Sequence, residues 1–371
     1  MMKINFIVYS FNQDNTGGVN RVVANLANQF CKHSDMNVTI YSLSECSSLA
    51  FEINQNVNLK SLDMEFYTPK QYSGFRKILW IFNVFKKLEY IVKEEKDAIW
   101  LSTSTPFNMV FGLIKMKYPD IKVIGCEHTS TVYSKGLLLD KLKSFFLKKL
   151  NYTVALTTQD KEYYKKIGVK NVEVIPNSIS SELFINHCDF QRKYVIYVGR
   201  FEEEKQPLLA LEAYHKSKLF EKGISLKMFG AGIQLENIKD YIKQNKLEDY
   251  VELISGENRI DKIYNNAYAL LLTSKIEGFP MVILEAIARN IPVLSFDVPY
   301  GPRNIIQHNK NGFLIEPYNI EKFVFYLSSK ELQNMQENDI SYTILGFVDK
   351  NIIKSWLKIL NVLVSNRLNL R

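Results

Sequence analysis

The chain has 371 residues, of which 47 are Lys or Arg and 39 are Asp or Glu, so it carries a formal net charge of +8 at pH 7. Hydrophobic residues make up 46% and charged residues 23%, which is typical of a soluble globular protein and excludes a disordered or collagen-like chain. The length predicts two domains, each large enough to bury its own core.

The cysteines indicate a reducing compartment. Cys31, Cys46, Cys126 and Cys188 are few, scattered and without Cys-x-x-Cys spacing, so neither a disulfide framework nor a zinc or redox site is expected. The N-terminal ten residues have no signal-peptide pattern, and no 18 apolar residues run together. We expect a cytoplasmic protein, or one that lies peripherally on the cytoplasmic face of the inner membrane.

Strands and helices are predicted to alternate along the chain. In the first half, β-branched or aromatic runs predict strands at 3–9, 37–42, 98–102, 122–125, 152–157 and 172–175. Helical periodicity between them predicts helices at 18–31, 74–94, 106–117, 135–150 and 159–167. The second half repeats this rhythm, with strands at 194–198, 225–229, 250–254, 269–272, 292–296 and 312–315. Its helices are predicted at 207–219, 233–244, 261–266, 280–289, 320–329 and 349–368.

This alternation predicts an α/β fold with two doubly wound parallel sheets. We expect a Rossmann-like domain over 1–180, a linker over 181–192, a second Rossmann-like domain over 193–345 and a C-terminal helix over 346–371. Ligands bind at the carboxyl ends of the strands in such sheets, so the loops that follow the strands are where function is expected. Two such edges facing each other would form a cleft.

The positive charge is concentrated in the first half. Residues 1–180 contain 23 basic and 16 acidic residues, so seven of the eight surplus charges lie there. Segments 75–87 and 135–149 combine helical apolar periodicity with lysines and aromatic residues, a pattern typical of a helix in an anionic lipid interface. A helix packed on a sheet, with solvated lysines, explains the pattern equally well. Nucleic acid is not expected as a partner, because the basic residues follow no binding motif.

Glycines and cations follow several predicted strands. Gly17 and Gly18 precede a helix, as do Gly230 and Gly232; glycines there let backbone N–H groups approach an anion or a sugar. A flexible surface loop is the alternative for Gly17-Gly18, and Gly230-x-Gly232 lacks the rest of a dinucleotide fingerprint. Arg200 and Lys205 leave a strand just before a helix and could neutralise a diphosphate. Surface pairing of both with neighbouring glutamates is the alternative.

The segment 274–286 is the most informative. A buried strand runs into a glycine turn, and Pro280 stands at a first helical position. Backbone N–H groups around Phe279 and Met281 would face a phosphate. Glu277 and Glu285 could accept hydrogen bonds from sugar hydroxyls. Glu285 could instead be a solvated helical residue, yet its neighbours are apolar.

Taken together, these residues resemble the retaining glycosyltransferases of group 1, or family 4, which have the two-Rossmann GT-B architecture. The most specific element is Glu277-x7-Glu285, which begins with the sequence Glu277-Gly278-Phe279-Pro280. Further elements in matching order are Gly17-Gly18, Glu127-His128, Val174-Ile175-Pro176-Asn177, Gly199-Arg200 with Lys205, Gly230-x-Gly232, Gly301-Pro302 and Asn311-Gly312. The chain departs from the family at Asn20-Arg21, where many members have Glu or Asp, at Ser178, where Gly usually follows Pro-Asn, and at Asn304, where an acidic residue is common.

The resemblance implies a role for each matching residue. Glu285 would bind the ribose hydroxyls, Glu277 the hydroxyls of the donor sugar, and Arg200 and Lys205 the diphosphate. His128 would donate or relay a hydrogen bond beside the donor sugar, although a lone histidine is more often structural. The rest of the nucleotide-sugar site would consist of Gly17, Gly18, Gly230, Gly232, Gly278, Phe279 and Pro280.

The implied activity is retaining transfer of a hexose or N-acetylhexosamine from a nucleotide sugar, expected to be UDP-linked. The acceptor would be a glycan or lipid-linked oligosaccharide in the biosynthesis of a capsule, O-antigen or similar surface polysaccharide. No metal and no cofactor is expected. The domain 1–180 would bind the acceptor, through loops 10–16 and 129–135, and 193–345 the nucleotide sugar; the final helix would return to the first domain. A sugar-nucleotide epimerase and a non-catalytic scaffold of a polysaccharide-assembly complex are the alternatives.

Overall fold

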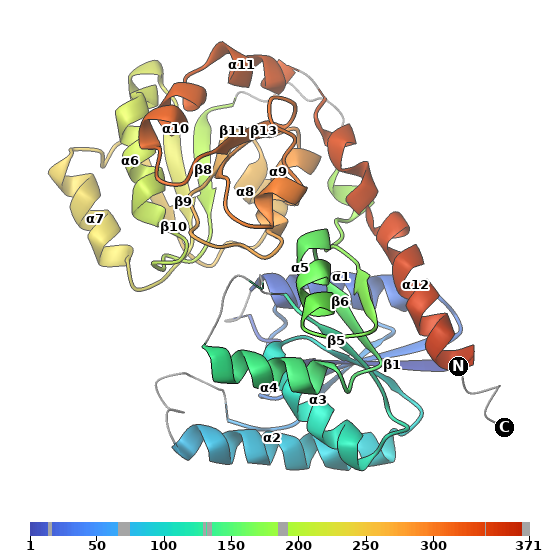
Figure 1. Cartoon of the computed structure of the whole chain (residues 1–371). Coiled ribbons are helices and arrows are strands. Elements are labelled where there is room, and N and C mark those ends of the chain that lie inside the picture. Colours follow the sequence, from blue (N-terminus) through green and yellow to red (C-terminus); the bar gives the residue numbers. More distant parts are fainter. Residues whose placement is uncertain are drawn as a thin grey trace. The chain divides into compact units, whose positions relative to one another are not determined.

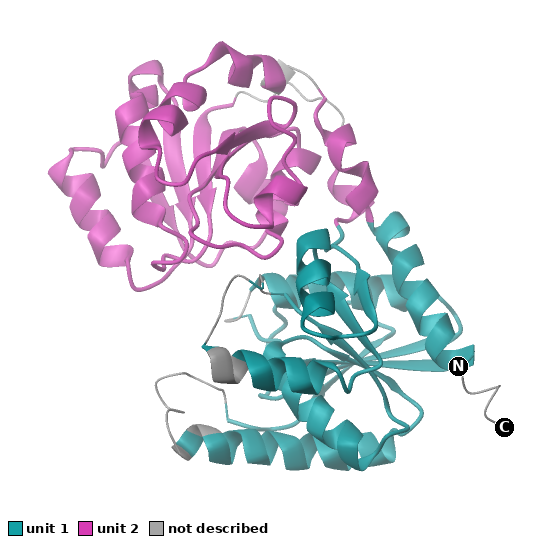
Figure 2. Cartoon of the chain, in the orientation of Figure 1, with its two compact units in different colours: residues 1–178, 349–371 teal, residues 179–348 magenta. Residues whose placement is uncertain are grey.

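The computed structural model describes residues 1–13, 17–65, 75–128, 131, 136–184, 192–337 and 339–365. They form two compact units, unit 1 of residues 1–178 and 349–371 and unit 2 of residues 179–348 (Figure 2). Each unit is built on one parallel sheet with packed helices (Figure 1), which confirms the predicted α/β fold. The expected linker, 181–192, lies mostly outside the described residues; its start forms the short 3-10 helix η1 (Ser181–Leu183).

Unit 1 has a sheet in which seven described strands pair in the order β3-β2-β1-β4-β5-β6-β7, all parallel. The strands are β1 (Met2–Val8), β2 (Met36–Ser42), β3 (Val57–Ser61), β4 (Ile99–Ser102), β5 (Lys122–Cys126), β6 (Tyr152–Ala155) and β7 (Val172–Val174). The helices are α1 (Gly18–Phe30), α2 (Phe75–Glu94), α3 (Thr105–Lys117), α4 (Leu137–Leu147), α5 (Thr158–Lys166) and α12 (Asp349–Ser365). The edge strand β3 was not predicted, because its alternating residues bury only Val57.

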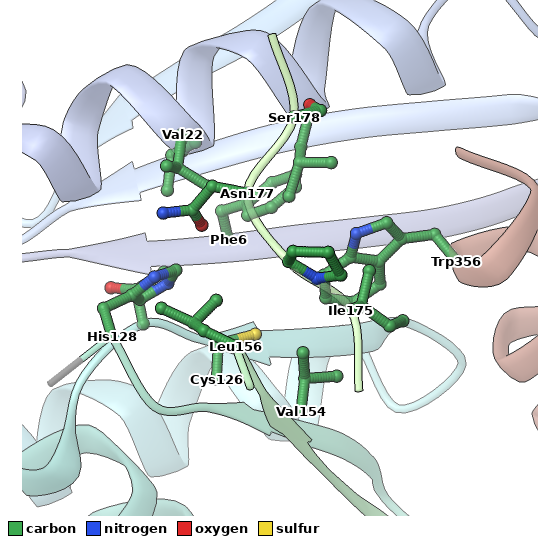
Figure 3. A pocket seen from close by; sticks show the side chains of 14 residues that line it. Phe6, Val22, Cys126, His128, Val154, Leu156, Ile175, Asn177, Ser178 and Trp356 are labelled. Carbon is green, nitrogen blue, oxygen red and sulfur yellow. The ribbon is translucent and has the colours of Figure 1, made fainter. Parts of the chain in front are cut away.

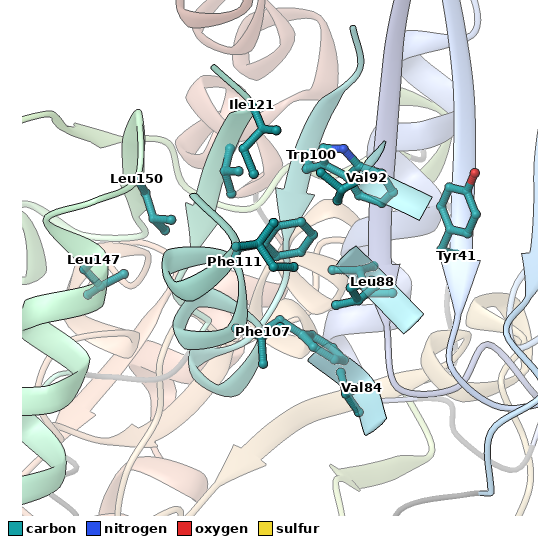
Figure 4. Close-up of a cluster of buried hydrophobic side chains, with 14 of the residues drawn as sticks. Tyr41, Val84, Leu88, Val92, Trp100, Phe107, Phe111, Ile121, Leu147 and Leu150 are labelled. Carbon is teal, nitrogen blue, oxygen red and sulfur yellow. The ribbon is translucent and has the colours of Figure 1, made fainter. Parts of the chain in front are cut away.

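Two helices cover one face of this sheet through regular apolar stripes. In α2, Trp80, Val84, Leu88 and Val92 are buried at every fourth position, so they line one side of the helix. The stripe of α3 is formed by Phe107, Val110, Phe111 and Ile114. Figure 4 shows Val84, Leu88, Val92, Phe107 and Phe111 gathered near Trp100 of β4. This cluster anchors both helices to the strands whose ends carry the candidate residues.

The C-terminal helix α12 belongs to unit 1 and packs on α1. The buried Trp356 meets the ring of Phe30 edge-on, with centroids 6.1 Å apart. The Nε2 of Gln29 donates to the Oδ2 of Asp349 at 2.5 Å. Residues from both ends of the chain therefore share one core.

Unit 2 has a sheet in which six described strands pair in the order β10-β9-β8-β11-β12-β13, all parallel. The strands are β8 (Tyr194–Val198), β9 (Ser225–Phe229), β10 (Val251–Ile254), β11 (Ala267–Leu272), β12 (Val293–Phe296) and β13 (Gly312–Ile315). The helices are α6 (Pro207–Ser217), α7 (Leu235–Gln244), α8 (Ile260–Tyr264), α9 (Met281–Ala288), α10 (Ile320–Leu327) and α11 (Lys330–Glu337). Short 3-10 turns are η2 (Leu219–Lys222), η3 (Pro302–Asn304) and η4 (Ser341–Phe347). All six strands were predicted, whereas α11 was not.

Across the part of the chain that is described, none of the helices has both the length and the apolar content needed to cross a bilayer.

Candidate active site

The carboxyl edge of the unit 2 sheet carries loops that are bonded to one another. The loop after β8 meets the loop after β9, because the N–H of Phe201 donates to the carbonyl of Ala231 at 2.8 Å. It also meets the loop after β11, where the N–H of Lys275 donates to the carbonyl of Glu204 at 2.8 Å. The hydroxyl of Thr273 donates to the carbonyl of Gln206 at 2.8 Å. These bonds bring residues from separate parts of the sequence into one site.

Glycines allow the close approach of these loops. A side chain at Gly230 would collide with the carbonyl of Gly199, and Gly232, at φ +155°, lies against the backbone of Phe201. A Cβ at Gly301 would lie 2.6 Å from the carbonyl oxygen of Gly278. Gly230 and Gly232 therefore have a packing role in addition to the nucleotide-binding role expected for them.

Lys205 and Glu277 form the charged centre of the site. The Nζ of Lys205 lies 2.6 Å from the Oε1 of Glu277, and the hydroxyl of Ser274 donates to the same oxygen at 2.6 Å. Both bonds use Oε1; the described residues supply no donor to Oε2. Lys205 thus pairs with a residue 72 positions away in the chain and not with Glu202–Glu204.

Arg200 lies apart from this pair. Its side chain is 67% exposed, and its Nη2 is 3.5 Å from the Oε2 of Glu204. An exposed pair at that distance contributes little to stability. The guanidinium of Arg200 is therefore held only weakly and can turn toward a bound anion.

Helix α9 presents the second carboxylate. Pro280 is the residue before its first turn, so the helix starts at Met281, one position later than predicted. Phe279 is buried and meets Phe347 with ring centroids 5.4 Å apart. Glu285 is 3% exposed, which excludes the solvated alternative. The hydroxyl of Tyr264 donates to its Oε2 at 2.7 Å, a partner that the sequence did not indicate.

In unit 1, His128 follows β5 and lines a small cavity of about 10 Å³ (Figure 3), room for about one water molecule. Figure 3 shows His128 on one side of it and Trp356 on the other. The Nδ1 of His128 is inaccessible and has no hydrogen-bond partner among the described residues. Burial lowers the pKa of His128 to about 4, although the neighbouring Glu127 acts in the opposite direction. The imidazole is therefore neutral at pH 7.

Glu127, the residue before His128, is buried and is the centre of a hydrogen-bond network. Its carboxylate accepts bonds from Lys143 of α4 at 2.6 Å and from Tyr164 of α5 at 3.3 Å. Asn108 and Thr105 of α3 donate to it at 2.6 Å and 3.0 Å. The motif pointed to this residue, but its four partners depend on how three helices pack around the end of β5.

The first helix begins with the expected glycines. Gly17 precedes α1 and Gly18 starts it; both are exposed, and a Cβ at Gly18 would meet nothing within 4 Å. The side chain of Asn20 donates to the carbonyl of Ser10 at 2.7 Å, a bond that an ionised acidic residue could not make. The departure from the family at this position thus has a structural reason.

The expected acceptor loops lie largely outside the described residues, which include 10–13 of the first and Thr131 of the second. Thr131 is anchored to α5, because its hydroxyl donates to the Oδ1 of Asp160 at 2.9 Å. Three or more His, Cys, Asp or Glu side chains do not gather as metal ligands anywhere in the described ranges.

Comparison with known proteins covers both units. Residues 182–365 match the family described as glycosyl transferases group 1, and residues 16–183 match glycosyltransferase family 4. The chain is 25% identical, over 97% of its length and 98% of the relative's, to the Campylobacter jejuni "GalNAc-alpha-(1->4)-GalNAc-alpha-(1->3)-diNAcBac-PP-undecaprenol alpha-1,4-N-acetyl-D-galactosaminyltransferase". It is 26% identical, over 94% of its length and 97% of the relative's, to the amylovoran biosynthesis glycosyltransferase AmsD of Erwinia amylovora.

A solved structure confirms the expected fold. A mutant of Staphylococcus aureus TarM in complex with fondaparinux, alpha-GlcNAc-glycerol and UDP superposes with a TM-score of 0.76 at 15% identity, covering 97% of this chain and 100% of that one. The two parallel sheets are thus those of the GT-B fold. The protein belongs to the group 1, family 4 glycosyltransferases.

Proposed function

We propose that this glycosyltransferase transfers a hexose or N-acetylhexosamine, with retention of configuration, from a UDP-sugar to a glycan or lipid-linked oligosaccharide acceptor in surface polysaccharide biosynthesis. The observation that carries the proposal is the Lys205–Glu277 pair, which lies at the strand edge of unit 2 beside the helix that holds buried Glu285. The names of the relatives support the substrate classes: UDP for TarM, an undecaprenol diphosphate glycan for the Campylobacter enzyme, and amylovoran for AmsD.

Lys205 and Arg200 would neutralise the diphosphate. Negative charge grows on the departing UDP as the bond to the sugar breaks, so cations beside the diphosphate stabilise the transition state more than the ground state. The backbone amides of Gly278 and Phe279 and the start of α9 would add fixed partial positive charge. These groups supply the countercharge without a resident metal.

Glu277 would bind the donor sugar through Oε2, because Lys205 and Ser274 already occupy Oε1. This arrangement removes the repulsion that an unpaired carboxylate would exert on the phosphates. Glu285 would accept hydrogen bonds from the ribose hydroxyls. Gly17, Gly18, Gly230 and Gly232 would let the backbone approach the nucleotide sugar. Pro280 would line the same site as the residue before α9.

His128 would act as a neutral hydrogen-bonding group beside the donor sugar, since its lowered pKa keeps it uncharged at pH 7. In the reaction, the bond from the anomeric carbon to the diphosphate oxygen breaks while the acceptor oxygen attacks the same face. The departing diphosphate oxygen takes the acceptor proton, so no enzyme nucleophile is required. The products are UDP and the extended acceptor.

Unit 1 would bind the acceptor, and its basic helices would lie against an anionic membrane. On α2, Ile78, Leu79 and Phe82 are exposed large apolar residues, and Lys86 stacks over the ring of Phe82 at 4.5 Å. On α4, Phe145 is exposed, and Lys149 lies 5.1 Å from its ring centroid. Exposed aromatics beside lysines favour an anionic lipid interface.

A donor screen followed by product analysis tests this function. UDP-sugars should raise the melting temperature of the protein in a nucleotide-sugar panel, because a ligand that binds only the folded state stabilises it. With acceptor present, NMR of the product should show the anomeric configuration of the donor. Turnover of the donor alone would indicate an epimerase, and the absence of nucleotide binding would indicate a scaffold.

A further inference from the structure

Tyr264 and Glu285 form a buried pair between two helices of unit 2. The hydroxyl of Tyr264, at the end of α8, donates to the Oε2 of Glu285 in α9 at 2.7 Å. Tyr264 is 1% exposed, and the two helices lie side by side (Figure 1). The bond therefore forms inside the protein.

Glu285 needs such a donor. Helix α9 reads Met-Val-Ile-Leu-Glu-Ala-Ile-Ala, so Glu285 is the one charged residue in an otherwise apolar helix. A carboxylate removed from water is strongly destabilising unless it accepts hydrogen bonds. The bond from Tyr264 offsets part of that loss and restricts rotation of the carboxylate about its last torsion.

The neighbouring contacts hold Tyr264 in place. Asn265, the next residue, accepts a bond from the guanidinium of Arg289 through its side chain and one from the hydroxyl of Tyr194 through its backbone carbonyl. Arg289 follows Glu285 by four positions, so both lie on the same side of the α9 segment. The adjacent residues Tyr264 and Asn265 thus bind Glu285 and Arg289, which lie one helical turn apart.

We infer that Tyr264 is the positioning residue of ribose recognition: its hydroxyl orients the Glu285 carboxylate so that the vicinal hydroxyls of a ribonucleotide are preferred over a 2′-deoxyribonucleotide. The inference rests on the proposed function, in which Glu285 binds the ribose. A preoriented carboxylate loses less conformational entropy when a diol binds, so the preference depends on the buried tyrosine.

The test compares UDP with 2′-deoxy-UDP by calorimetry on the full chain. Tyr264→Phe removes only the hydroxyl and should weaken UDP binding about tenfold while changing 2′-deoxy-UDP binding less than about twofold, since a buried hydrogen bond to a charged group has that scale. Tyr214→Phe is the matched control. Tyr214 is also fully buried, and its hydroxyl donates to the backbone carbonyl of Ile224 at 2.9 Å and not to Glu277 or Glu285.

Both phenylalanine variants should lose stability, so a melting-temperature shift alone does not support the inference. p-Aminophenylalanine at position 264, which retains a donor, should restore the wild-type ratio of UDP to 2′-deoxy-UDP affinity. The inference is overturned if Tyr264→Phe keeps the wild-type ratio while Glu285→Gln loses it, a result that leaves the proposed function intact. Failure of the wild-type protein to bind UDP would overturn both together.

Discussion

Glu277 accepts hydrogen bonds from Lys205 and Ser274 on one and the same carboxylate oxygen, each at 2.6 Å. The three residues come from the loops after β8 and β11, which the strand order places next to each other. The cation proposed to bind the diphosphate and the carboxylate proposed to bind the donor sugar are thus already oriented by one another.

Replacing Lys205 by Ala should reduce kcat by about two to three orders of magnitude, because a preorganised positive charge that acts on the transition state is lost. The measurement is steady-state transfer with a UDP-sugar. Lys216→Ala on α6 is the control: Lys216 pairs with Glu212 at the surface, 2.6 Å away, and should leave the rate unchanged. Full activity of the Lys205 variant would refute its assignment to the diphosphate.

Breaking the Glu127–Lys143 pair should destabilise unit 1. Lys143→Met leaves the buried carboxylate without its cation and should lower the free energy of unfolding by about 3 kcal/mol. Chemical denaturation measures this value. Lys161→Met, which breaks a more exposed pair of 3.5 Å with Glu173, should change it by less than about 0.5 kcal/mol. Equal losses of unfolding free energy in the two variants would contradict a stabilising role for the buried Glu127–Lys143 pair.

His128 should make stability depend on pH. Its pKa falls from an ordinary value near 6.5 to about 4 in the folded protein, so between these values the unfolded chain binds more protons. Folding is therefore stabilised fully above pH 6.5, and the contribution declines as the pH falls toward 4. Between pH 6.5 and pH 4, the free energy of unfolding of the wild-type protein should fall by about 2–3 kcal/mol more than that of the His128→Gln variant. Chemical denaturation at a series of pH values measures both. Parallel pH curves for the two proteins would argue against an imidazole kept neutral in the folded protein.

Membrane contact should depend on the basic helices of unit 1. The fraction of protein that sediments with phosphatidylglycerol vesicles should fall when Lys86, Lys87, Lys148 and Lys149 are changed to Gln, and should also fall as salt is raised. A set with the same charge loss on unit 2, Lys216, Lys218, Lys222 and Lys239, serves as the control. Similar losses from both sets would indicate general charge attraction in place of a defined surface.

Most strands and helices could be predicted from the sequence because each depends on the residues within its own short segment. Val195, Ile196 and Tyr197 form an apolar run of strand length, and all three are buried in β8. The edge strand β3 escaped prediction because polar residues alternate through it. Helix α11 escaped because most of its residues are polar, so its short apolar signal does not stand out.

The sequence by itself determined that Lys205, Glu277 and His128 follow strands and that Glu285 lies in the helix after Glu277, since periodicity and turn residues act over a few positions. Only the tertiary structure decided their partners: Lys205 meets Glu277 across 72 positions, and Glu285 meets Tyr264 across 21. The physical reason is that strand order and helix packing decide which side chains meet, and burial then requires each charge to find a donor or a counterion. The amino-acid sequence shows the charged residues but not which side chains become their partners in the folded protein.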